Sequence, residues 1–201
     1  MKVRNSPATC DCALPVHERR HVLQAAFGAA LGSLLPGIVV AQDTEPRNAR
    51  PQQGDRFVFA GGDRKGAIVM VSDLQLGGPP VSAYPQEPRS GIVRDGSRLN
   101  QVLLIRLDAA ELTEATRSRA PDGIVAYSAI CTHTGCDSWS WQSEDRMLKC
   151  PCHDSEFDAK DGARVNAGPA PRRLAALPLK IVDDVVIAAD VFVGRVGFQP
   201  G

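Results

Sequence analysis

The fold and function of this chain are decided by two short stretches, Cys-Thr-His-Thr-Gly-Cys at residues 131–136 and Cys-Pro-Cys-His-Asp-Ser at residues 150–155. Each stretch supplies one Cys and one His, and each also carries a spare Cys. A ligand Cys must be a thiolate and a ligand His must offer a ring nitrogen. Because each pair is only two or three residues apart, a single loop can direct both side chains at one centre. Two such loops at the ends of neighbouring strands would enclose a metal centre from both sides.

Both stretches closely resemble the ligand loops of Rieske iron–sulfur proteins, in which one iron of a 2Fe–2S cluster takes Cys ligands and the other takes His. The resemblance implies one cluster per chain, with Cys131 and Cys150 on the inner iron and His133 and His153 on the outer iron. It also implies an all-β fold: a Rieske-type antiparallel β-sandwich with one short helix and an N-terminal signal or anchor helix. The cluster-binding subdomain would span about residues 124–173.

Three further features are implied by the same resemblance. Cys136 and Cys152 match a pair that forms a disulfide in the Rieske proteins of quinol-oxidising complexes; two free thiols are the alternative, although an oxidising compartment favours the bond. Gly-Pro-Ala-Pro at 168–171 resembles the rigid loop that shields the cluster, and is otherwise an ordinary surface loop. Ser155 stands where the family has a hydroxyl bonded to a cluster sulfur, a bond that raises the reduction potential.

The chain departs from the family pattern at three positions. Phe157 replaces a Tyr whose hydroxyl bonds a ligand sulfur in many quinol-oxidising members. We therefore expect a potential below the top of the roughly −150 to +300 mV Rieske range. Thr134 stands where Leu is frequent and Asp154 where Gly is frequent. The tip, by which we mean the end of the domain that carries the two ligand stretches, is thus more polar. This polarity weakens the case for quinol as the direct electron donor.

Two other metal centres are weighed against the cluster. Two Cys and two His could bind structural zinc, but zinc fingers usually place the paired Cys together and the paired His together. A Rieske oxygenase needs a second iron held by two His and one carboxylate. The chain has four His, of which His17 and His21 precede the domain and the other two belong to the cluster, so no His remains for a catalytic iron.

Composition and pattern beyond the ligand stretches are those of a β domain. The formal net charge is zero, which argues against a nucleic-acid partner. Short β-prone runs alternate with Gly and Pro turns, and an Asp-Ala-Ala-Glu start predicts one helix at about 108–117. The predicted strands are 57–59, 67–71, 102–105, 124–128, 147–149, 177–182 and 185–189.

The first 41 residues resemble a twin-arginine export signal. Arg19 and Arg20 precede an apolar run at 22–41 that ends in a small-residue cleavage pattern near Ala41. A retained anchor that contacts the membrane through residues 20–41 and a buried helix are the alternatives. Residues 42–55 are polar and predict a linker, and 56–201 the domain. Cys10, Cys12 and His17 offer only three possible metal ligands, so they do not predict a metal site.

The resemblance implies electron transfer on the periplasmic side of a bacterial inner membrane. In the first interpretation the chain is the iron–sulfur subunit of a quinol–cytochrome c reductase, with cytochrome b and cytochrome c-type partners and with His153 contacting quinol. In the second, the chain is the small relay subunit of a large exported oxidoreductase, as in arsenite oxidase. In neither does the chain have a catalytic site of its own for an organic substrate.

Overall fold

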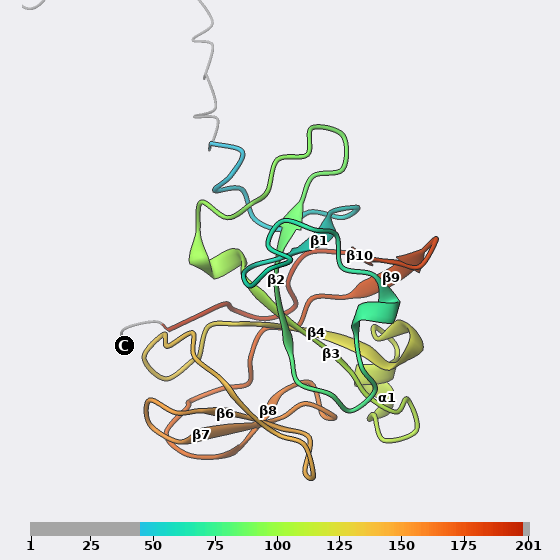
Figure 1. Cartoon of the computed structure of the whole chain (residues 1–201). Coiled ribbons are helices and arrows are strands. Elements are labelled where there is room, and N and C mark those ends of the chain that lie inside the picture. The colour runs from blue at the N-terminus through green and yellow to red at the C-terminus, as the bar shows by residue number, and fades with distance from the viewer. Residues whose placement is uncertain (1–44, 199–201) are drawn as a thin grey trace, which may run out of the picture. The chain divides into compact units, whose positions relative to one another are not determined.

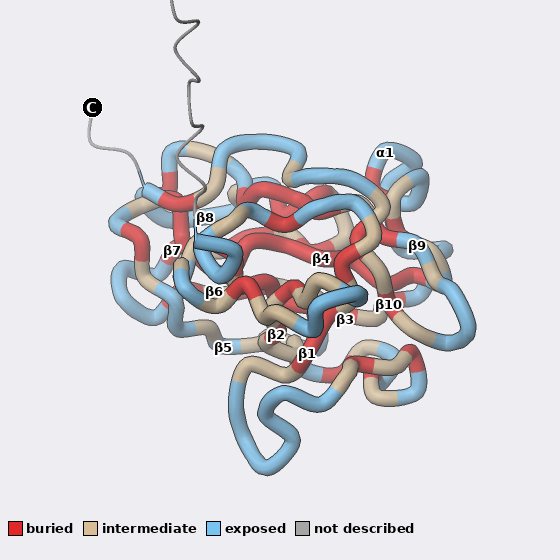
Figure 2. The backbone as a smooth tube through the Cα atoms, turned by 90° about the horizontal axis from the view of Figure 1, so that it is seen from above, coloured by how far each residue is buried: buried red, intermediate tan, exposed pale blue. Residues whose placement is uncertain are grey.

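Two nearly continuous apolar runs lie at the centre of the computed structural model, which describes residues 45–198. β3 (Val102–Arg106) pairs antiparallel with β4 (Ile124–Ser128), and both strands are buried over nearly their whole length. Strands that are covered on both faces read as continuous hydrophobic runs rather than alternating ones. Figure 2 shows this buried pair inside the domain.

Two antiparallel sheets make up the fold, which confirms the all-β prediction (Figure 1). The six-stranded sheet has the order β4-β3-β2-β1-β10-β9, and the four-stranded sheet has the order β5-β6-β7-β8. The remaining strands are β1 (Arg56–Phe59), β2 (Val81–Gln86), β5 (Ser140–Gln142), β6 (Met147–Cys150), β7 (Ser155–Asp158), β8 (Arg164–Ala167), β9 (Leu179–Val182) and β10 (Val185–Ala188). The short helices are η2 (Val71–Asp73), η3 (Arg98–Asn100), α1 (Glu114–Arg117) and η4 (Pro121–Gly123).

The residues of β3 alternate between two hydrophobic clusters. Leu103 and Ile105 pack with Leu148 of β6 and Phe157 of β7, so one cluster joins the two sheets. Leu104 faces the other way, into a cluster built on residues of β1, β2 and β10. The ligand-bearing strand β6 is therefore fixed to the large sheet by side-chain packing.

Two predicted elements differ from the structure. The segment predicted as a strand at 67–71 makes only isolated bridges, because the Asp73 carboxylate accepts the backbone N–H of Met70 and starts the turn η2. The helix predicted from residue 108 begins only at Glu114. Asp108 instead accepts the N–H of Ala110 through its side chain, a local turn that competes with helix.

Strands β2, β5, β7 and β8 were not predicted, and β2 shows why. It contains Pro85, which cannot donate a ladder hydrogen bond and argues against an interior strand. In the structure β3 pairs only with Val81 to Ala83. Pro85 lies beyond that pairing, where its carbonyl accepts from the N–H of Arg94, so the missing donor costs no sheet bond on that side.

Residues 45–55 fall in the segment that the sequence predicts to be a linker, but they pack on the domain. Asp55 is buried and accepts two hydrogen bonds from the Arg94 guanidinium, at 2.6 and 3.0 Å. The Asn100 amide also donates to the carbonyl of Ala49. The predicted signal or anchor at 1–41 lies outside the described residues. Within 45–198, no helix has the length and apolarity that a bilayer crossing requires.

Candidate metal centre

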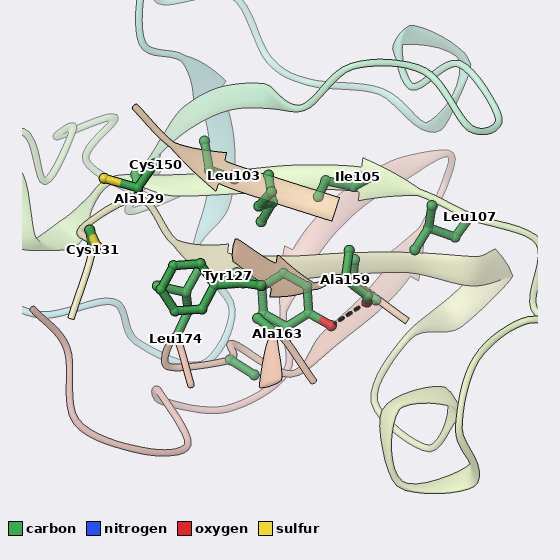
Figure 3. Packing of buried hydrophobic residues seen from close by; sticks show 14 of the residues in the cluster. Leu103, Ile105, Leu107, Tyr127, Ala129, Cys131, Cys150, Ala159, Ala163 and Leu174 are labelled. Atoms are coloured by element: carbon green, nitrogen blue, oxygen red, sulfur yellow. Dashed lines mark hydrogen bonds between the residues drawn. The ribbon is translucent and has the colours of Figure 1, made fainter. Parts of the chain in front are cut away.

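The two ligand stretches form two loops at the edge of the core that joins the sheets. The first ligand loop, residues 131–136, follows β4, and the second, residues 150–155, connects β6 to β7 as a tight turn. Figure 3 shows the sulfur-bearing side chains of Cys131 and Cys150 at the same end of the packed cluster. Packing of β4 against β6 thus brings together two loops that are 19 positions apart in the chain.

The two inner thiols are buried next to each other. Cys131 and Cys150 are each 1% exposed. Burial raises the pKa of the Cys131 thiol to about 11, the neighbouring Cys150 thiol raises it further, and the backbone N–H groups of His133 and Thr134 oppose the rise. Two adjacent thiolates in a buried site need a compensating cation, which a metal ion supplies.

The two imidazoles lie together and nearer to solvent. The His133 and His153 rings pack edge to face, with centroids 4.6 Å apart and planes at 87°. His133 is half-buried and His153 exposed. The Nδ1 atom of His133 is buried without a hydrogen-bond partner, although buried ring nitrogens are normally paired. An unpaired, buried nitrogen fits a metal ligand.

The four residues form two pairs rather than one tetrahedral cage. Tetrahedral zinc holds four ligand atoms at about 2.0–2.3 Å, so these atoms must lie close to one another. Among the residues that the structure describes, the one group of three or more potential metal ligands whose atoms all lie within 4.8 Å of one another is Cys136, Cys150 and Cys152. Two of these sulfurs are joined in a disulfide. A sulfur pair and a nitrogen pair fit a two-iron centre with different ligands at each iron.

The predicted disulfide is present and joins the two ligand loops. Cys136 is bonded to Cys152, 16 residues later, with 6.7 Å between the Cα atoms. Cys136 is also the residue whose carbonyl accepts the N–H of Cys131 at 2.7 Å. The bond therefore links the backbone turn around one inner thiol to the loop that carries His153.

The proline loop, residues 168–171, lies against both ligand loops. The N–H of Ala170 donates to the Ser155 hydroxyl at 3.2 Å, and the Thr132 hydroxyl donates to the carbonyl of Arg172 just beyond the loop. Gly168 has φ +84°, and a Cβ there would lie 2.6 Å from the carbonyl oxygen of Asp154. Only glycine allows this close approach of backbone to backbone.

Ser155 is 1% exposed, and its oxygen accepts the Ala170 N–H, so the hydroxyl hydrogen remains free to donate to a further group. We expect Ser155→Ala to lower the reduction potential of the bound cluster by about 40 mV. One net hydrogen bond to the reduced form is worth roughly 1 kcal/mol, and 1.4 kcal/mol corresponds to 59 mV for one electron. The measurement is a redox titration followed by visible absorption.

Ser128→Ala is the matched control for this substitution. Ser128 is equally buried and its hydroxyl also accepts a backbone N–H at 3.2 Å, from Ile130. We expect Ser128→Ala to leave the potential within a few millivolts of the wild-type value. Equal shifts in the two variants would remove Ser155 from the neighbourhood of the cluster.

The structure shows the conformation, contacts and exposure of the three residues that depart from the family pattern. Asp154 adopts φ +56°, a conformation that favours Gly and that Asp tolerates. Its side chain is 75% exposed and pairs with Lys149 at 3.0 Å. Phe157 is fully buried with its ring edge-to-face on Trp139, so this position contributes packing and no hydroxyl. Thr134 is exposed, as a polar tip requires.

The sequence did not indicate the residues that support the first ligand loop from outside. Trp139 donates its indole N–H to the carbonyl of Ala129 at 2.8 Å. Arg98 donates to the carbonyl of Gly135 at 2.8 Å from 37 positions earlier in the chain. A lone Trp or Arg carries no spacing signal, so only the folded structure reveals these contacts.

Comparison with known proteins agrees with this geometry. Residues 100–178 match the protein family described as Rieske [2Fe-2S] domain. The chain is 38% identical over 89 residues to the cytochrome bc1 complex Rieske iron-sulfur subunit of Streptomyces lividans, covering 44% of this chain and 52% of that protein. It is 37% identical over 122 residues to the putative respiratory nitrate reductase subunit Rieske of Haloferax mediterranei, covering 60% and 52%.

A third curated relative is the cytochrome bc1 complex Rieske iron-sulfur subunit of Mycobacterium tuberculosis H37Rv, 35% identical over 104 residues, which are 49% of this chain and 24% of that protein. The chain spans about half the length of these relatives or less. A solved structure described as a hyperthermophilic respiratory Complex III aligns with a TM-score of 0.39 and 26% identity, over 59% of this chain and 71% of that one.

Proposed function

The chain carries a Rieske [2Fe-2S] domain, and on that premise we propose that it transfers single electrons as the iron–sulfur subunit of a quinol–cytochrome c reductase-like complex. A bound 2Fe–2S cluster takes up and releases one electron at a time. We propose Cys131 and Cys150 as the sulfur ligands and His133 and His153 as the nitrogen ligands. The observation that carries the proposal is the buried thiol pair beside a more exposed imidazole pair.

The two ends of the site differ in exposure, so a partner would exchange electrons with the cluster through one end. The two thiols face the core, whereas the His153 ring is exposed at the tip. A partner that contacts the tip therefore meets the imidazole end first, and we propose His153 as the residue that contacts a quinol hydroxyl. The proline loop is bonded to Ser155 and the disulfide joins the two ligand loops, while both thiols are buried, which limits water access to the sulfur end.

Membership in a quinol-oxidising complex rests on the relatives named as cytochrome bc1 subunits. Cytochrome b and cytochrome c-type subunits would then be the partners. We also propose export by the twin-arginine route to the periplasmic side of the inner membrane, on the strength of Arg19 and Arg20 and the apolar run that follows. The mature protein is then either anchored through residues 20–41 or released by cleavage near Ala41.

One specific observation favours a second function, that of the small relay subunit of a large exported oxidoreductase. Asp154 of the second ligand loop forms an ion pair with Lys149, and Thr134 of the first ligand loop is exposed. Burying charges in an apolar quinol pocket costs several kcal/mol for each ion. The relative named as a nitrate reductase Rieske subunit fits such a relay.

The test compares quinol-dependent reduction of cytochrome c by membranes of the source cells with and without the gene. We expect the activity to disappear on deletion, to return with the wild-type gene, and to stay absent with Cys150→Ser. Unchanged activity after deletion would exclude the first function. Recovery of the tagged protein with a large cofactor-bearing subunit, and without b-type haem, would establish the second.

A further inference from the structure

We propose that Arg98 and Gly197, a residue near the end of the given sequence, position the first ligand loop, and with it His133, from outside the Rieske region. This inference rests on the proposed function, because it concerns residues that act on a bound cluster through the loop. Arg98 and Gly197 both lie outside the matched residues 100–178. Neither touches a proposed ligand atom, so both are positioning residues. We call Arg98, Arg172 and Gly197 the loop bracket.

Arg98 is hydrogen-bonded to the turn that carries His133. Its Nη1 donates to the carbonyl of Gly135 at 2.8 Å, and its side chain also pairs with Asp137 at 3.6 Å. The N–H of Gly135 in turn donates to the carbonyl of Cys131 at 3.0 Å. Both backbone polar groups of Gly135 are thus hydrogen-bonded: its N–H to the carbonyl of Cys131 and its carbonyl to the guanidinium of Arg98. His133 lies between Cys131 and Gly135 in the chain.

The C-terminal segment supports the same loop from a second direction. The Arg172 guanidinium donates to the carbonyl of Gly197, and the backbone carbonyl of Arg172 accepts from the Thr132 hydroxyl. Gly197 has φ +72°, and a Cβ there would lie 3.1 Å from Leu99 and 3.3 Å from Ile130. The residue directly before the first ligand loop is therefore in tight contact with a segment more than 60 positions later.

The bracket acts on the part of the site that most needs support. The Cys131 and Cys150 thiols are held by the packed core, whereas His133 is carried at the outer turn of a loop. A ligand must be held to within about 0.5 Å of its productive position by supporting contacts. Supporting residues of this kind typically change metal affinity by 10–100-fold when they are lost.

The experiment measures three properties of the full-length cluster-bearing protein: the rate of iron loss to a chelator, the EPR g values and the reduction potential. For Arg98→Met we expect iron loss at least 10-fold faster than in the wild type, with broadened g values. Arg98→Lys, which keeps one donor and the charge, should recover part of the difference. Gly197→Ala should also accelerate iron loss, because the added methyl would lie 3.1 Å from Leu99 and 3.3 Å from Ile130, so these side chains must shift next to the first ligand loop.

Two matched controls separate positioning from general loss of stability. Arg47 is similarly exposed and also pairs with an Asp, Asp95, but it contacts no ligand loop. Gly194 has a positive φ of +94° like Gly197, yet a Cβ there meets nothing closer than 3.7 Å. Arg47→Met and Gly194→Ala should therefore keep the wild-type g values and rate of iron loss.

The outcomes separate this inference from the proposed function. A wild-type protein that holds no iron overturns the proposed function itself. A wild-type protein that holds the cluster, with Arg98→Met indistinguishable from Arg47→Met, overturns the role of Arg98. Equal rates for Gly197→Ala and Gly194→Ala overturn the role of Gly197, and this comparison stays decisive even if Arg98→Met does not fold.

Discussion

Cys150→Ser should abolish cluster binding and leave a colourless protein with almost no iron. Cys150 ends β6 inside the core that joins the sheets, with its thiol against that of Cys131. A serine hydroxyl ionises far less readily than a thiol and is a poor ligand for a site that selects soft sulfur donors. The measurements are iron content, labile sulfide and visible absorption of the purified variant.

Cys152→Ser is the control for this prediction, two residues further along the same loop. Cys152 is exposed and bonded to Cys136. We expect this variant to assemble the cluster and then to lose it faster than the wild type, because the two ligand loops are no longer joined. Full iron content in Cys150→Ser would exclude Cys150 as a ligand. If Cys152→Ser then held no iron, the assignment of ligand and disulfide cysteines would be reversed.

Gly168→Ala should destabilise the cluster-bearing protein by about 2–5 kcal/mol, from roughly 1–2 kcal/mol for the left-handed backbone and a further 1–3 kcal/mol for the overlap. Gly168 has φ +84°, and the added methyl would lie 2.6 Å from backbone atoms of Asp154 and Ser155. The proline loop must therefore move away from the second ligand loop. The measurement is the midpoint of thermal unfolding, with visible bleaching followed in parallel.

Gly91→Ala separates backbone strain from the loss of contact between the loops. Gly91 has a φ of +71°, but a Cβ there meets nothing within 4 Å. This control should cost only the strain of about 1–2 kcal/mol and should leave the rate of bleaching unchanged. If Gly168→Ala behaves like Gly91→Ala, the proline loop does not pack on the second ligand loop in solution.

The β-prone runs between Gly and Pro turns predicted the all-β class, and the resemblance of the two ligand stretches to Rieske proteins implied the disulfide between Cys136 and Cys152. That resemblance rests on the motifs at 131–136 and 150–155, which can be recognised from short spacings without any tertiary knowledge. The strands β3 and β4 were also predicted, because strands buried on both faces keep uninterrupted apolar runs.

Other parts of the structure could not be predicted because tertiary contacts decide them. Pro85 argues against a strand from local rules, but β2 forms because the pairing with β3 ends before that residue. Residues 45–55 are polar enough to predict a linker, yet the buried pair of Asp55 with Arg94 holds the segment on the domain. The contact of Arg98 with Gly135 likewise joins distant segments and has no local signature.

A two-iron cluster in this chain would have sulfur donors at one end and nitrogen donors at the other. Its composition and ligation can be measured by iron and labile sulfide analysis combined with EPR of the dithionite-reduced, folded protein. We expect two irons and two sulfides per chain and a low average g value, as His ligation of one iron requires. Folded protein that contains zinc, or that binds neither iron nor sulfide after reconstitution, would contradict it.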